Sequence, residues 1–544
     1  MTVTAIIAYA DRIEIVTDIP LPASAVGRAY VPLTRGETGR HTPSRLLCEV
    51  SRCGQCPAQI FCADTPSRLL CEVSPIEGER MIFPRYTDGY DLLIARFTVT
   101  IEGEEADGGC YVTDVDAVAS RGRDPRLPVG KPIGTWVTCQ GDDMDHLGFG
   151  GMMTEINMAW IMTLTPGPED IPHEWNGKTY HFVKATMDTY DRLMQPCIER
   201  GVPCLVRLIN RFSYRLKGSD ESLRRVIGHP AYEDTGFCEQ MSAFNVTNEA
   251  GLDHFCACVD FLCARYADPE SPLFCSAVMD VGNEINAQAV WHNCGPMTCG
   301  DYMEEYAQQL RLAHLIGRKY NAAHRVDVSF DHHFAIPYRP DPLRYYASKE
   351  CLFTLAALSR RDGDFPWGIS AHPYPEDLTK PDFYNDKTAT LDPDTPRITM
   401  KNLEVWQYLS THPDLTYRGL PRAVVFDEQG FHTDYDDPES ENKGAYAFVL
   451  LWQKLKRCPS VEQFLINRYA DMPLGDEGGL HLGLRYERGY ADAEHLFINP
   501  GPYKKICAAI RAMGTEEEET WISEARAYIG EDLFDGLLAP PPCF

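Results

Sequence analysis

The sequence predicts an α/β protein: a (β/α)8 TIM barrel that follows a small β-rich, sandwich-like domain. From about residue 130, eight apolar strand-like runs alternate with amphipathic helical segments over about 380 residues. Before that point, short β-branched and aromatic runs are bounded by Gly, Pro, Asp and Asn and carry no helical period. A chain of 544 residues is too long for one ordinary domain. We therefore expect a β-rich domain at residues 1–125 and a catalytic barrel at residues 126–544.

The N-terminal region is expected to form a small β-sandwich from the runs IEIV, RAYVPL, LLIARFTVTI and CYVTDVDAVA. The segment TPSRLLCEVS occurs there twice, at residues 42–51 and 65–74. An exact copy indicates a local duplication or an artefact of sequence assembly, because a solenoid needs several degenerate repeats. Cys53 and Cys56 lie between the copies as a C-x-x-C pair, which is half of a zinc site. No second pair matches it, so ordinary cysteines are the favoured interpretation.

The barrel prediction depends on eight buried strands, which we place at residues 134–139, 153–162, 202–209, 274–281, 325–330, 367–371, 422–427 and 461–467. Apolar residues recur at helical spacing between residues 252 and 266 and again between residues 303 and 316. This spacing predicts one helix before the fourth strand and one after it. A doubly wound sheet is the alternative, but no glycine-rich phosphate turn supports it.

Composition and charge narrow the classes of function. Lys and Arg number 51 against 79 Asp and Glu, and the net charge of −28 disfavours nucleic acid or an anionic membrane as partner. No apolar run is long enough to predict a membrane span. The start of the given chain lacks the features of a secretory signal. We therefore expect a cytoplasmic protein whose 20 cysteines are mostly free thiols.

Two glutamates end predicted strands that face each other across the mouth of a barrel. Glu284 ends the fourth strand, within GNEIN, and Glu428 ends the seventh, within DEQGF. Such a pair is what glycosidic cleavage requires, because one carboxyl group protonates the leaving oxygen while the other attacks the anomeric carbon or activates water. Two unrelated surface glutamates are the alternative. Flanking glycines, aromatics and Asn283 make that alternative less favoured.

An Asn-Glu pair ending strand four and a Glu ending strand seven resemble the retaining "4/7" barrels, clan A of the glycoside hydrolases. The resemblance implies that Glu284 is the general acid/base and Glu428 the nucleophile. It also implies that Asn283 is the hydrogen-bond partner of the sugar 2-hydroxyl. The end of strand six, HPY at residues 372–374, fits as well, since that clan often places a tyrosine against the nucleophile.

More narrowly, six motifs in order resemble a bacterial, glycosidase-like family of unknown function, DUF5722. They are YVTDVD (111–116), GNEIN (282–286), SFDHHF (329–334), HPYPED (372–377), DEQGF (427–431) and HLGLR (481–485). The resemblance covers roughly residues 85–500. It implies a barrel that cleaves a β-glycosidic bond in an oligo- or polysaccharide by a retaining mechanism, without a cofactor. It implies no particular sugar.

The remaining strand ends predict a sugar-binding cleft, whose walls we expect from the long loops at 211–250, 334–366, 375–398 and 431–441. For each side chain alone, a structural role is a comparable alternative. Arg468 in particular has a second possible role, the orientation of Glu428. The residues that we expect to bind substrate are Asn157, Asn210, Asn283, Trp291, Asp331, His333, His372, Tyr374 and Arg468. Further candidates are Trp160, Arg207, His332, Tyr469 and Asp471.

Two other functions stay open from the residues. The first is a non-catalytic carbohydrate-binding barrel, which the presence of both glutamates disfavours. The second is a metal-dependent hydrolase that uses Asp331, His333 and His372. Adjacent strand residues point to opposite faces, so only one of the histidines at 332 and 333 is expected to face the mouth. No H-x-H or H-x-x-x-H pair completes a site there, and we expect no metal.

Overall fold

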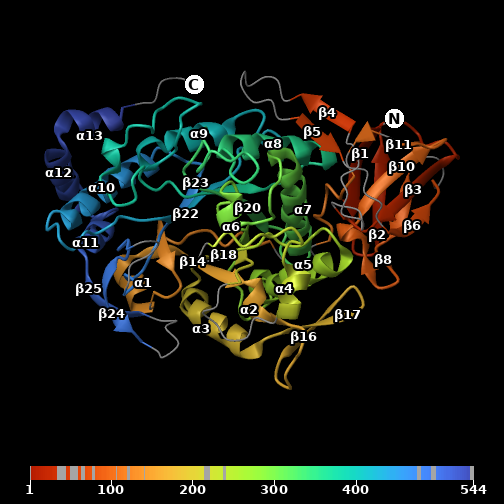
Figure 1. Cartoon of the computed structure of the whole chain (residues 1–544), viewed down its shortest axis with the longest axis horizontal. Helices are drawn as coiled ribbons and strands as arrows, with labels where there is room; N and C mark the ends of the chain where they lie inside the picture. The colour runs from red at the N-terminus through yellow and green to blue at the C-terminus, as the bar shows by residue number, and fades with distance from the viewer. Residues whose placement is uncertain are drawn as a thin grey trace.

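The computed structural model describes residues 2–33, 45–49, 59–62, 68–75, 80–105, 107–108, 110–118, 123–139, 141–212, 221–236, 240–473, 479–491 and 498–539. A closed barrel of parallel strands forms its centre. The N-terminal strands gather at one end of the molecule and the C-terminal helices at the other (Figure 1).

The N-terminal strands form two four-stranded sheets. One has the order β12 (Asp107–Gly108), β1 (Thr2–Ala8), β2 (Arg12–Thr17), β7 (Met81–Pro84). The other has the order β11 (Glu104–Glu105), β10 (Arg96–Ile101), β3 (Ala25–Tyr30), β6 (Leu69–Val73). Phe83 of the first sheet meets Phe97 of the second, with ring centroids 5.1 Å apart. Alternate residues of β3 are buried, as expected of a strand with one face on a core. The predicted sandwich is therefore confirmed.

The same region holds two separate two-stranded sheets. In one, β4 (Arg45–Glu49) pairs with β5 (Gln59–Cys62), and in the other, β8 (Tyr86–Thr87) pairs with β9 (Tyr90–Asp91). The short helix η1 (Leu92–Ile94) follows β9. The two copies of the repeated segment supply β4 and β6, which belong to different sheets. Cys53 and Cys56 lie outside the described residues, so the zinc hypothesis stays a prediction.

The predicted barrel is confirmed, and all eight of its strands pair in parallel with both neighbours. In order around the barrel they are β13 (Lys131–Trp136), β14 (Phe149–Asn157), β18 (Cys204–Ile209), β19 (Val278–Val281), β20 (Arg325–Phe330), β21 (Gly368–Ala371), β22 (Val424–Gln429) and β23 (Val461–Ile466). Each predicted strand overlaps one of these, although the fourth begins at Val278 and not at residue 274.

Helices separate the barrel strands along the chain. They are α1 (Gly141–Leu147), α3 (Lys184–Arg200), α4 (Glu221–Ile227), α5 (Glu249–Leu262), α6 (Gln288–Trp291), α7 (Cys299–Gly317), α8 (Ser348–Asp362), α9 (Glu404–Thr411) and α10 (Ser440–Leu455). Shorter turns are η2 (Cys263–Ala267), η3 (Phe383–Asn385) and η4 (Met400–Asn402), and the chain finishes with β24 (Arg485–Tyr490), β25 (Ile498–Tyr503), α11 (Lys505–Ala512), α12 (Glu518–Ile529) and α13 (Glu531–Leu537). Both helices predicted around the fourth strand are present, as α5 and α7.

The second predicted strand, 153–162, is wrong in its latter half. β14 ends at Asn157, whose side chain accepts a hydrogen bond from Ala159 N at 3.1 Å and so caps the short helix α2 (Met158–Ile161). Residues of α2 are buried like strand residues, so hydrophobicity alone did not separate the two structures. After α2, the strands β15 (Met162–Thr163), β17 (Lys178–Phe182) and β16 (Ile171–Trp175) form a separate sheet.

Every cysteine whose side chain the structure describes is a free thiol, and most of them are buried. Burial raises the pKa of such thiols, to about 12 for Cys458 and Cys507, which keeps them protonated and unreactive. Within the described ranges, no helix has the length and apolar character needed to cross a membrane.

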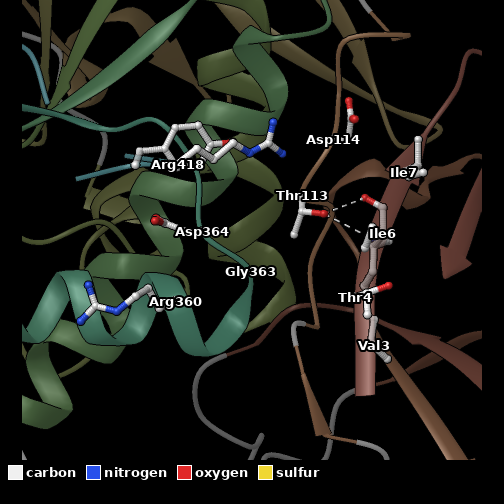
Figure 2. A pocket seen from close by; sticks show the side chains of 12 residues that line it. Val3, Thr4, Ile6, Ile7, Thr113, Asp114, Arg360, Gly363, Asp364 and Arg418 are labelled. Atoms are coloured by element: carbon white, nitrogen blue, oxygen red, sulfur yellow. Dashed lines mark hydrogen bonds between the residues drawn. The ribbon is translucent and has the colours of Figure 1, made fainter. Parts of the chain in front are cut away.

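A crevice of about 480 Å³ separates β1 from segments that lead into β21 and β22 (Figure 2). Ile6 and Thr113 line one wall, and Asp364 and Arg418 line the other. The latter two precede their strands, so the crevice lies at the amino-terminal end of the barrel. Asp364 is paired there with Arg422 at 3.1 Å. Catalytic groups of this fold are expected at the opposite, carboxyl-terminal end.

Gly134 lets two barrel strands approach closely. A Cβ atom there would lie 1.6 Å from the backbone oxygen of Gly151 on β14, which cannot move without breaking the barrel. We expect Gly134→Ala to lower the free energy of unfolding by several kcal/mol, about the size of severe overpacking. Gly536→Ala in α13 is the matched control, because its Cβ meets nothing within 4 Å. Urea denaturation should show that only the first change is costly; equal midpoints would contradict this account.

Candidate active site

Glu284 is positioned by a tight turn that follows β19. Gly282 has a φ of +86°, and a Cβ there would lie 2.9 Å from His292. Glu284 itself has a φ of +36°, a left-handed conformation that costs a side-chain-bearing residue about 1–2 kcal/mol. Its backbone N–H donates to Ser329 Oγ at 3.2 Å, and that of Ile285 donates to Ser329 O at 3.0 Å. These bonds to β20 hold the strained turn in place.

Glu428 is aimed by a bulge in β22. Phe426 pairs with Phe464 and Gln429 pairs with Ile466, so three steps along β22 match only two along β23. A bulge of this kind turns side chains away from their regular alternation. Glu428 can therefore point into the barrel mouth next to Asp427, which also points inward.

The two glutamates lie close together, as the positions of their strands predict. Glu284, His372 and Glu428 each offer an atom, and these atoms all lie within 4.8 Å of one another. The side chain of Glu284 is 13% exposed and that of Glu428 is 15% exposed. Both carboxyl groups are thus largely desolvated, yet a ligand can reach them.

Arg207 of β18 lies beneath the pair and holds Glu428. Its Nη1 donates to Glu428 Oε2 at 2.5 Å, and its Nη2 donates to Asp427. The guanidinium side chain is only 1% exposed. A buried cation at this distance stabilises a charged carboxylate strongly. Arg207, which the sequence placed only among the polar groups of the cleft, thus contacts Glu428 in the way that the sequence suggested for Arg468. The orienting role of Arg468 itself stays a prediction.

His372 follows β21 and contacts the other glutamate. Its Nδ1 lies 2.7 Å from Glu284 Oε1. Its Nε2 lies 3.3 Å from Asp427 Oδ1, 3.2 Å from Ser329 Oγ and 3.0 Å from Arg207 Nη2. The ring is completely buried. Burial favours the neutral ring, but the surrounding carboxylates prevail and raise the pKa of His372 to about 10.

The surroundings move the proton affinities of the two glutamates in opposite directions. Burial raises the pKa of Glu284, and its bond to His372 only partly opposes this effect. Burial also disfavours the charge of Glu428, but His372 and Arg207 outweigh it and lower the pKa of that carboxyl. Two neighbouring carboxyl groups with divided proton affinities are suited to separate acid and nucleophile roles.

Tyr374 lies against the same carboxylate as Arg207. Its hydroxyl is 3.4 Å from Glu428 Oε1 and accepts a hydrogen bond from Asn467 Nδ2 at 3.0 Å. The ring packs with Leu480 and Leu482. This places the strand-six tyrosine beside the seventh-strand glutamate.

The three predicted asparagines differ in how many hydrogen bonds their side-chain amides already make within the protein. Asn157 caps α2, accepts from Arg211 N at 2.9 Å and donates to Arg211 O at 2.8 Å, so its amide is occupied. Asn210 donates to Ile227 O at 3.0 Å, while its Oδ1 is buried without a hydrogen-bond partner. Asn283 Oδ1 is also buried without one. A buried acceptor without a hydrogen-bond partner costs free energy, and a donor on a bound ligand would remove that cost.

Asp331 and His333 form a pair beside the strand-five end. Asp331 Oδ2 lies 3.0 Å from His333 Nδ1, and Asp331 Oδ1 accepts from Asn286 Nδ2 at 2.7 Å. Asn286 belongs to the turn of Glu284, so this pair buttresses that turn. Trp291 is half-buried and packs against the cluster of Ala287, Ala289, Val290 and Tyr345. Arg468 follows β23, where its backbone pairs with Leu482 and Leu484.

The side-chain cluster with metal-ligand spacing is Glu284, His372 and Glu428, within the residues that the structure describes. It differs from the set Asp331, His333 and His372 that the metal-dependent alternative requires. Both ring nitrogens of His372 are already in hydrogen-bond contact with protein groups. A raised histidine pKa also opposes coordination, because a metal needs the neutral ring. The donor set therefore fits proton transfer better than metal binding.

A family model described as "Family of unknown function (DUF5722)" matches residues 131–535. A comparison with curated proteins finds no match. Among solved structures, a family 39 glycoside hydrolase from the gut symbiont Bacteroides cellulosilyticus WH2 is 12% identical, with a TM-score of 0.43 over 94% of this chain and 79% of that one. A hyperthermophilic β-glucosidase from Pyrococcus furiosus is 13% identical, with a TM-score of 0.43 over 72% and 87%. A family 1 β-glucosidase from Thermotoga maritima is 12% identical, with a TM-score of 0.40 over 68% and 84%.

Proposed function

We propose that this chain, which belongs to the family of unknown function DUF5722, hydrolyses β-glycosidic bonds with retention of configuration. One observation carries the proposal. Two largely desolvated carboxyl groups, Glu284 and Glu428, have oxygens within 4.8 Å of each other, and their surroundings raise the pKa of the first and lower that of the second.

The spacing favours retention over inversion. Retaining enzymes hold their carboxyl groups roughly 5–5.5 Å apart, whereas inverting enzymes need roughly 6.5–9.5 Å to admit a water molecule between carboxylate and sugar. One oxygen of Glu284 lies within 4.8 Å of one oxygen of Glu428, and so close an approach supports the shorter, retaining spacing.

In the first step, Glu428 attacks the anomeric carbon while the bond from that carbon to the leaving oxygen breaks. Arg207 and His372 keep the nucleophile ionised by their positive charge. Glu284, whose pKa burial raises, gives its proton to the departing oxygen. The product is a glycosyl-enzyme ester at Glu428 with inverted anomeric configuration.

In the second step, the Glu284 carboxylate takes a proton from water, which attacks the anomeric carbon and releases Glu428. The second inversion restores the β configuration. Glu284 thereby regains the proton that it gave up, and no cofactor takes part. His372 donates to Glu284 Oε1 through this cycle and stabilises its transient negative charge.

Substrate contacts follow from unsatisfied groups beside the pair. The buried acceptor Asn283 Oδ1 adjoins Glu284 in the chain and suits a sugar hydroxyl. Asn210 Oδ1 offers a second such acceptor. Asn157 is assigned a structural role instead, because its amide is occupied. The family match begins at residue 131, which accords with a division into a β-rich region, 1–125, and a catalytic barrel, 126–544.

A panel of 4-nitrophenyl α- and β-glycosides tests the proposal. We expect hydrolysis of at least one β-glycoside, unchanged by EDTA, and loss of that activity in Glu428→Gln. Glu519→Gln, a change at an exposed glutamate of α12, is the matched control and should keep full activity. Sugar binding without turnover would instead favour the non-catalytic barrel. Loss of activity on chelation, restored by a divalent metal, would favour the metal-dependent hydrolase.

A further inference from the structure

Asp427 precedes Glu428 in the chain and is completely buried. Its Oδ2 accepts from Arg207 Nη2, its Oδ1 accepts from Ser370 Oγ, and the same Oδ1 lies 3.3 Å from His372 Nε2. Asp427 therefore touches the two basic side chains of the site at once. Each of these contacts one glutamate directly, Arg207 the nucleophile and His372 the acid/base.

The bulge in β22 makes this arrangement possible. Consecutive residues of a regular strand point to opposite faces, so Asp427 and Glu428 would not share one side. The extra residue between Phe426 and Gln429 turns both carboxylates towards Arg207. The Arg207 guanidinium thus binds both Glu428, the proposed nucleophile, and Asp427, which takes part in neither proposed step. The role of Asp427 therefore needs a separate explanation.

We propose that Asp427 is a positioning residue that holds His372 as an imidazolium, and that this imidazolium sets the proton affinity of Glu284. The inference rests on the proposed function for its kinetic part and on geometry alone for the state of His372. The chain of contacts is short: Asp427 Oδ1 to His372 Nε2 at 3.3 Å, then His372 Nδ1 to Glu284 Oε1 at 2.7 Å. No solvent-exposed group intervenes.

The charges around the ring favour the imidazolium. Glu284 faces it from the turn after β19, Asp427 and Glu428 act on it from β22, and Arg207 opposes them from β18. On β20, Ser329 offers a hydroxyl, while Arg325 and Asp327 form an ion pair with each other at 2.7 Å. Past the end of β20, burial keeps His332 neutral by lowering its pKa to about 3. The competing arrangement is a neutral ring whose Nε2 accepts from Arg207 Nη2.

Glu284 is in turn balanced between opposing effects. Burial favours its protonated form, and so do the carboxylates of Asp331 and Glu428, whereas His372 favours the carboxylate. Asp427→Asn removes the counter-charge of His372, so the ring should become neutral at neutral pH. A neutral ring stabilises the Glu284 carboxylate less, whichever nitrogen keeps the proton. Glu284 should then hold its proton to higher pH. The fall of kcat/KM on the alkaline side should therefore occur at a higher pH.

The state of His372 is measured first, without reference to activity. Protein labelled with ¹⁵N at its histidines, compared with His372→Gln for assignment, should show both ring nitrogens of His372 protonated at pH 8. Asp427→Asn should convert this signal to a neutral ring, while Ser370→Ala, which removes only a hydroxyl donor from Asp427, should leave it charged. A neutral His372 in the unaltered protein overturns the proposal even if Asp427→Asn does not fold.

The second measurement is the pH dependence of kcat/KM on the best aryl β-glycoside. Asp427→Asn should move the alkaline limb upward by about one pH unit or more, the effect of losing a nearby opposite charge. Asp260→Asn removes a buried carboxylate of α5, one bound to Lys319 at 2.7 Å, and should leave that limb in place. An unmoved limb in Asp427→Asn refutes the coupling. Absence of glycosidase activity in the unaltered protein refutes the proposed function instead, and the His372 signal remains decisive for this one.

Discussion

Glu428→Ala should lower kcat/KM on every glycoside substrate by about 10⁴-fold or more, the scale of losing an essential nucleophile. The reason is that no glycosyl-enzyme can form without a carboxylate on that face of the sugar. Good and poor leaving groups should suffer alike, because the missing group acts on the carbon and not on the departing oxygen. Initial rates on an aryl β-glycoside and on an unactivated oligosaccharide measure both.

Azide should restore part of the activity of Glu428→Ala by entering the space of the lost side chain. It would displace the leaving group in one step, so the product should be the α-glycosyl azide. Glu519→Ala, a change at an exposed glutamate of α12, should show neither the loss nor the rescue. Recovery of a β-azide from Glu428→Ala would show that this residue is not the nucleophile.

The loss of activity in Glu284→Ala should depend on the leaving group, whereas the loss in Glu428→Ala should be the same for all leaving groups. Glu284 supplies a proton to the leaving oxygen, which a 4-nitrophenolate needs little and a sugar alkoxide needs strongly. Loss of general acid catalysis should cost about 10²–10⁴-fold on the oligosaccharide and much less in the glycosylation step with the aryl glycoside. Pre-steady-state release of nitrophenol, followed by a slow steady state, is the expected signature.

Deglycosylation of Glu284→Ala should remain slow, because the same residue serves as base on the attacking water. Azide needs no base, so it should accelerate turnover and give the β-glycosyl azide. A change of Glu284 to Gln should behave in the same way, as it removes the proton but keeps the shape. If both glutamate variants lost activity equally on all substrates and azide rescued neither, the assigned roles would be wrong.

The sequence predicted the barrel because each strand is a local feature. A short apolar run between amphipathic segments reports its own burial, and the eight runs overlap the eight observed strands. The ends of the runs were less certain. Asn157 ends β14 early through a capping bond of its side chain, and apolar residues that continue past it belong to α2.

Glu284 and Glu428 were also accessible to sequence reasoning, since a strand number and a strand end place a residue on the barrel rim. Their neighbours below the rim were not. Arg207 meets Glu428 across 221 residues of sequence, and only closure of the barrel brings them together. Strand alternation predicts that Asp427 points away from Glu428. The bulge that reverses this depends on pairing between β22 and β23, which no single segment encodes.

For His372, the sequence offered only its residue type and its position at a strand end. A histidine two residues before Tyr374 at the end of a barrel strand was expected to touch substrate. The structure instead buries it completely, with one nitrogen on Glu284 and the other beside Asp427. Neighbouring carboxyl groups and a titratable ring shift one another's pKa values, as is typical of functional sites. The sequence does not show that these groups are neighbours, because they come together only in the folded barrel.

The central claim is retention by the pair Glu284 and Glu428, and the anomeric configuration of the first-formed product tests it most directly. Proton NMR spectra recorded within minutes of adding enzyme to the aryl β-glycoside it cleaves fastest should show the β-sugar appearing first. The α-sugar should grow only later, at the rate of spontaneous mutarotation. Initial appearance of the α-sugar would contradict a double displacement at these glutamates and assign the enzyme an inverting mechanism.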